Sequence, residues 1–107
     1  MKTFEIVKVV HGLLTAWMYS KGLTPENHID VDTLQEPHEI YTMEGTVSEE
    51  FSEMFDIHQE LENLTTDLED FLETYNAKTK YPLKLYDIRL YECHECGELM
   101  IEVSLYR

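Results

Sequence analysis

Two cysteines lie three positions apart near the C-terminus, in the run Cys93-His94-Glu95-Cys96-Gly97. Two thiolates at this spacing in a tight turn can point at one tetrahedral centre, which is the geometry that zinc prefers. Cys93 and Cys96, with His94 between them, are therefore candidate zinc ligands. The chain has no further cysteine, so a four-ligand site needs other histidines or a second copy of the chain. Two alternatives remain open: a pair of inert free thiols, and a redox-active or disulfide-bonded pair.

The sequence around this turn resembles one knuckle of a zinc ribbon, in which a strand, C-x-x-C-G and a returning strand follow one another. The resemblance covers about a dozen residues, and it implies a β-hairpin whose tip holds the metal. A ribbon needs a second knuckle, which this chain lacks. A thioredoxin-type role fits less well, because in that motif a helix follows the cysteines, whereas a strand pattern follows them here.

Other residues that could carry chemistry give weaker patterns. His28, Asp30 and Asp32 alternate, so in an extended segment they share a face and could bind a hard metal ion. They lack the length and the glycine of an EF-hand loop, and a solvated loop is the favoured interpretation. His58 and Glu62 lie one helical turn apart and could bind a metal ion. His58, however, belongs to the series of apolar positions that recurs through residues 48–77, where a core or interface histidine is expected. No serine has a nucleophile context and no glycine-rich phosphate loop is present, so we expect no enzyme.

The longest periodic segment runs from Ser48 to Ala77 and contains ten carboxylates but no Lys or Arg. Its apolar residues recur every three or four positions, which predicts a helix with one buried face. We expect that face to pack on a sheet or on the first helix, and a homodimeric coiled coil is the alternative. At about 100° per residue, five carboxylates form one stripe opposite the seam. These candidate partner-binding residues are Glu49, Glu53, Asp56, Glu60 and Asp67.

The charge of the chain limits its partners. With 22 acidic and 8 basic residues, the net charge is −14, which disfavours nucleic acid and anionic membranes and favours basic proteins. In size and charge the chain is similar to phage-encoded inhibitors of host DNA-handling or defence enzymes, some of which mimic DNA. Ten charges over about 45 Å of helix give about one per 4.5 Å, whereas a single DNA strand carries one per ~3.4 Å. The acidic helix alone is thus a sparse phosphate mimic, and a purely solubilising role is the alternative.

The remaining elements must support this helix. Thr3 to Tyr19 has the polar spacing of a helix, which Lys21-Gly22 would end with a left-handed glycine. The alternative is a strand over Phe4 to Val10, where four of seven residues are β-branched. Thr24-Pro25 indicates only a turn or a short helix. Ile40 to Met43 could form a short strand closed by Gly45.

The C-terminal residues predict an antiparallel hairpin. Apolar residues alternate from Leu83 to Tyr91, with a phase shift near Tyr86-Asp87 that predicts a bulge, and again from Leu99 to Leu105. Two strands alone are marginal, so a third is expected from residues 40–43 or from the N-terminus. We therefore predict one α+β domain over residues 1–107, with two main helices, one long and acidic, packed on a small antiparallel sheet built around a C-terminal β-hairpin. No signal peptide or membrane-spanning run is visible, which predicts a cytoplasmic protein.

Overall fold

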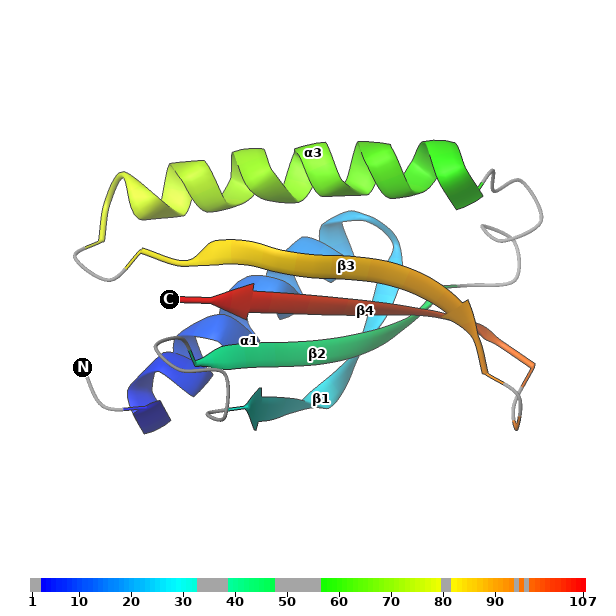
Figure 1. Cartoon of the computed structure of the whole chain (residues 1–107), viewed down its shortest axis with the longest axis horizontal. Coiled ribbons are helices and arrows are strands. Elements are labelled where there is room, and N and C mark those ends of the chain that lie inside the picture. The colour runs from blue at the N-terminus through cyan, green and yellow to red at the C-terminus, as the bar shows by residue number, and fades with distance from the viewer. Residues whose placement is uncertain (1–2, 33–38, 48–56, 80–81, 94, 96) are drawn as a thin grey trace.

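The chain folds as two helices packed on a four-stranded antiparallel sheet (Figure 1). The computed structural model describes residues 3–32, 39–47, 57–79, 82–93, 95 and 97–107. The sheet has the strand order β1-β2-β4-β3. The elements in chain order are α1 (Thr3–Ser20), β1 (Leu23–Asp32), β2 (Ile40–Val47), α3 (Ile57–Asn76), β3 (Lys84–Glu92) and β4 (Leu99–Tyr106). The predicted α+β fold is confirmed.

One hydrophobic core joins both helices to the sheet. Figure 1 shows α3 running along β3, while α1 passes behind the other strands. The buried residues of α1 recur at helical spacing, as do those of α3, and alternate residues of β2 and β4 meet them. The prediction that the apolar face of the acidic helix packs on a sheet is therefore confirmed over the described part of α3, whose neighbour in the sheet is β3. The buried residues there are Leu68 and Leu72 of the seam and Leu64, which flanks it.

The C-terminal hairpin forms the centre and one edge of the sheet. Strands β3 and β4 pair antiparallel, and their register shifts between Leu85 and Asp87, so the predicted bulge is confirmed. The third strand is β2, which pairs with β4 along its other side. Of the two sources expected for a third strand, residues 40–43 are the correct one, because the N-terminal residues form α1.

Two predictions in the first half of the chain are wrong. The region after Gly22 is not a turn or short helix but the ten-residue edge strand β1, which pairs with β2. Its apolar residues are few because only one face of this edge strand contacts the core. The register shift between Pro25 and Ile29 accommodates the proline. Gly45 does not close a strand but lies within β2, where an added Cβ would come 2.9 Å from Met18 Sδ of α1.

The end of α1 agrees with its prediction. Gly22 has φ +74°, and its N–H donates a 3.2 Å hydrogen bond to the carbonyl oxygen of Tyr19. The first turns predicted for the acidic helix, residues 48–56, lie outside the described residues. None of the described helices has the length and apolar character that crossing a membrane requires.

Candidate functional site

The solvent face of α3 carries an uncompensated acidic surface. The helix contains six carboxylates and no Lys or Arg. Four of these side chains are exposed, and within the described part of the chain no cation forms an ion pair with any of them. We call these residues the α3 acidic surface: Glu62, Glu69, Asp70 and Glu73. An unpaired anionic surface of this kind attracts basic partners.

Two arginines elsewhere in the fold pair with acids of the same chain. Arg89 on β3 donates two hydrogen bonds across the strand pair to the carboxylate of Glu102, at 3.0 and 3.1 Å. Arg107 forms an ion pair with Glu39 at 3.4 Å. Glu102 and Glu39 are therefore paired within the fold, while the described residues provide no ion pair for the α3 acidic surface.

Of the five carboxylates in the predicted stripe, the structure describes only the side chain of Asp67. Glu49, Glu53 and Asp56 lie outside the described residues, and for Glu60 only the helical backbone is described. Asp67 lies on α3 and faces α1 rather than open solvent alone, so we leave it out of the acidic surface.

Asp67 binds two residues at the end of α1. Lys21 Nζ lies 2.9 Å from Asp67 Oδ1, and the indole N–H of Trp17 donates a 2.8 Å hydrogen bond to Asp67 Oδ2. The Lys21 contact is the main cause, with Trp17 contributing, of a pKa for Asp67 below its ordinary value, and partial burial opposes the shift. The carboxylate thus ties α3 to α1. Sequence periodicity could not reveal this role, because the two partners lie almost fifty residues away.

A different stripe occupies the flank of α3 that faces β3. Glu62, Glu69 and Glu73 are separated by seven and four residues, so at about 100° per residue they fall within about 40° of one another. None of these three belongs to the stripe that the sequence predicted. Their spacing could have identified the stripe, but only the fold shows that it borders the neighbouring strand.

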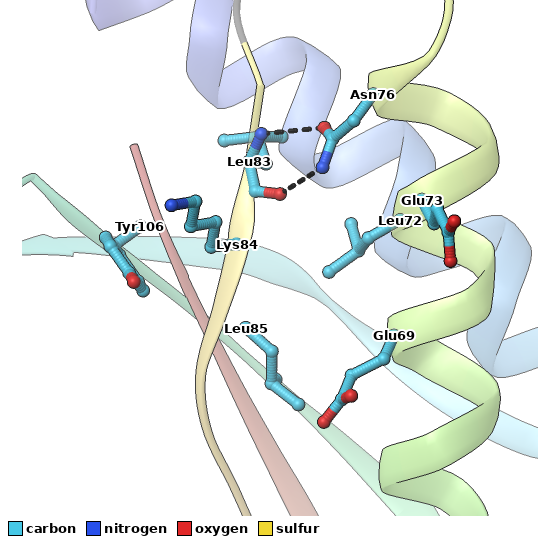
Figure 2. A pocket seen from close by; sticks show the side chains of 8 residues that line it. All are labelled: Glu69, Leu72, Glu73, Asn76, Leu83, Lys84, Leu85 and Tyr106. Carbon is cyan, nitrogen blue, oxygen red and sulfur yellow. Dashed lines mark hydrogen bonds between the residues drawn. The ribbon is translucent and has the colours of Figure 1, made fainter.

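A groove of about 350 Å³ lies between the C-terminal half of α3 and the start of β3 (Figure 2). Leu72, Leu83 and Leu85 supply its apolar surface, while Glu69 and Glu73 line it from the helix. Figure 2 shows the Glu69 carboxylate extending from α3 towards Leu85. The groove therefore combines aliphatic walls with negative charge.

An amide clamp fixes the width of this groove at one end. Asn76 Nδ2 donates a 2.8 Å hydrogen bond to the carbonyl oxygen of Leu83, whose own N–H donates a 2.9 Å bond to Asn76 Oδ1 (Figure 2). One side chain thus satisfies both backbone groups of a residue that no strand pairs. The end of α3 and the beginning of β3 are held at a set separation.

The far wall of the groove comes from the hairpin. Lys84 and Tyr106 occupy paired positions on β3 and β4. The Lys84 side chain extends away from α3 towards Tyr106 in Figure 2, and it forms no ion pair with the two glutamates of the groove among the described residues. The Tyr106 ring packs edge-on against Tyr86, with 6.0 Å between centroids.

The predicted metal ligands lie at the tip of the hairpin. Cys93 N–H donates to the carbonyl oxygen of Glu98 and Gly97 N–H donates to that of Cys93, both at 2.8 Å. Gly97 has φ +68°, which lets the chain reverse tightly. Cys93 is disulfide-bonded, and in that state its sulfur is not a thiolate ligand.

The other two predicted ligands, His94 and Cys96, lie outside the described residues. Within the described ranges no three His, Cys, Asp or Glu side chains gather as a metal site would require. Zinc binding by Cys93, His94 and Cys96 therefore stays a prediction.

The alternating His28 and Asp30 share a face of edge strand β1, as their spacing predicted. His28 Nε2 lies 2.8 Å from Asp30 Oδ1, and both side chains are about 70% exposed. Such an exposed contact contributes little energy and provides no dry environment for acid–base chemistry.

Comparison with protein-family models, with curated proteins and with solved structures finds no match for this chain.

Proposed function

We propose that this protein is a small interaction module that docks the acidic face of α3 on a basic partner protein, in the manner of a phage-type inhibitor of a nucleic-acid-binding protein. The observation that supports the proposal is the contrast in ion pairing. Among the described residues, the four carboxylates of the α3 acidic surface form no ion pair, whereas Lys21, Arg89 and Arg107 each pair with another acid, namely Asp67, Glu102 and Glu39. The proposal assigns no reaction to the protein.

The charge density of α3 limits how far the protein can imitate DNA. Twenty helical residues span about 30 Å, and six carboxylates over that length give about one per 5 Å. This is sparser than the ~3.4 Å spacing of a single DNA strand. The partner is therefore engaged through a few localised contacts rather than along a continuous phosphate-like track, unless residues 48–56 extend the surface.

The test begins by capturing a basic protein from the native host. The binding measurement is then repeated with the two purified proteins. Because exposed charges are screened within about 8 Å at physiological salt, affinity should fall strongly between about 50 and 300 mM salt. The double variant Glu62→Lys/Asp70→Lys should weaken binding at least tenfold. A matched control, Glu5→Lys/Glu26→Lys, makes the same charge change at exposed positions elsewhere. Salt-independent affinity, or equal losses in the two variants, would contradict the proposal.

A zinc-stabilised binding module at the hairpin tip is the second candidate. The tight turn closed by the Cys93 and Gly97 hydrogen bonds supports it, and it applies to the reduced chain, since zinc binds thiolates. Metal analysis of protein purified with a reductant tests it. Absence of zinc, together with an unchanged melting temperature in Cys93→Ser, would reject it.

A further inference from the structure

We propose that the groove between α3 and β3 receives an arginine side chain of the partner. This inference rests on the function proposed above and names the chemistry of the contact. The groove is the place in the described structure where the acidic surface meets a hollow with aliphatic walls. Each part of an arginine side chain has a counterpart there.

The walls suit the aliphatic stem of the side chain. Leu85 is the partly exposed leucine of the groove and provides its accessible apolar surface, while Leu72 and Leu83 form the buried floor beneath it, at 3% and 2% exposure. A long cationic side chain can lay its methylenes on such a surface while its charged end stays near water. A purely hydrophilic cation would gain nothing from these leucines.

The helical side of the groove suits the guanidinium. Glu69 and Glu73 both line the groove from α3. In Figure 2 the Glu69 carboxylate extends towards Leu85, the Glu73 carboxylate extends away from it, and Lys84 on the opposite wall extends away from both. A guanidinium has five donors in a planar fork and can bind two carboxylates, or one of them bidentately. An ammonium is more strongly hydrated and lacks that fork, so arginine fits better than lysine.

The groove is also held open before binding. The Asn76 amide is already bonded to both backbone groups of Leu83, so it holds the start of β3 at a set distance from α3. Preorganisation of this kind lowers the ordering cost of association. Buried arginines are frequent among the residues that dominate interface energies.

The first experiment uses N-acetyl-arginine amide as the probe. Nitrogen-15 NMR titration should show saturable shifts centred on the amides of Leu72, Leu83 and Leu85, with millimolar affinity. The neutral isostere N-acetyl-citrulline amide should cause no saturable shift, and N-acetyl-lysine amide should bind several-fold more weakly than the arginine derivative. Shifts spread over the whole acidic surface, or equal binding of citrulline, would overturn the proposal.

The second experiment uses two double variants with the same net charge. Glu69→Gln/Glu73→Gln should weaken arginine amide binding at least fivefold, whereas Glu62→Gln/Asp70→Asn should change it less than twofold. All four residues are exposed, so both variants should keep the fold. Leu85→Ala removes part of the wall without touching charge and should also weaken binding. Equal losses of arginine amide affinity in the two double variants would overturn the proposal that the groove binds arginine.

The same variants separate the groove from the proposed function. When the captured partner binds with strong salt dependence but both double variants weaken it equally, the groove proposal is wrong and the docking function stands. When the partner's affinity does not change with salt concentration, the docking function is wrong. The arginine amide titration then still decides whether the groove binds a guanidinium group.

Discussion

Replacing Asp67 with alanine is expected to destabilise the fold by about 1–3 kcal/mol, the usual cost of leaving a buried polar group without its partner. Trp17 is 1% exposed, and its indole N–H donates to Asp67. The substitution removes this acceptor and leaves the donor buried. Lys21 loses the same carboxylate, but its side chain is 31% exposed and water can replace the contact, so this loss adds about 0–1 kcal/mol.

Two other substitutions separate these contributions. Asp67→Asn keeps an oxygen that can accept from Trp17 and removes only the charge, so it should cost less than about 1 kcal/mol. Asp70→Ala makes the same side-chain truncation at an exposed position one turn away, and it should change stability by no more than about 0.5 kcal/mol. The difference between Asp67→Ala and Asp70→Ala also cancels the gain in helix propensity that alanine brings at both sites.

Urea unfolding followed by the fluorescence of Trp17, the single tryptophan, measures these changes. A loss of about 2 kcal/mol should lower the urea midpoint by about 1 M. Unfolding curves that coincide for Asp67→Ala and Asp70→Ala would refute the argument that Asp67 joins the two helices.

The Asp67 contribution should also depend on pH. Its pKa is lower in the folded protein than its ordinary value, chiefly because of Lys21. The carboxylate therefore stabilises the fold fully above that ordinary value, and the stabilisation disappears as pH falls through the folded pKa. The stability difference between the wild type and Asp67→Asn should vanish in acid. A difference that persists at the lowest pH would contradict this assignment.

Three further changes test the packing and electrostatics. Gly45→Ala should cost about 1–3 kcal/mol in urea unfolding, because the new Cβ would come 2.9 Å from Met18 Sδ; an unchanged midpoint would show that α1 can move aside. Asn76→Ala should cost about 1–3 kcal/mol and broaden the Leu83 amide in NMR spectra, since both backbone groups of Leu83 lose their partner; a native amide signal would contradict the clamp. Burial and the neighbouring Glu39 raise the pKa of Tyr41 above its ordinary value of 10.0, so its stabilising effect is complete below that value and is lost as pH rises; Tyr41→Phe should reduce the loss of stability in alkali.

Local periodicity in the sequence was enough to predict most of the fold. Each of α1, α3 and β4 buries one face. Its apolar residues therefore recur with the period of the element, every three or four residues in the helices and every second residue in β4. The bulge near Tyr86 was visible as a change of phase. Strand β1 was harder to predict, because its alternation covers only residues 28–32 and the register shift between Pro25 and Ile29 separates that stretch from the start of the strand.

The candidate site depended more on the tertiary structure. The sequence determined that α3 is acidic, unopposed by its own cations and apolar on one face. It could not determine that Asp67 turns to Trp17 and Lys21, or that Glu69 and Glu73 border a groove with β3. Those relations join residues distant in the chain, and only packing brings them together. Composition alone decided how much charge the protein carries, whereas the fold decided which of the described charges pair within the chain.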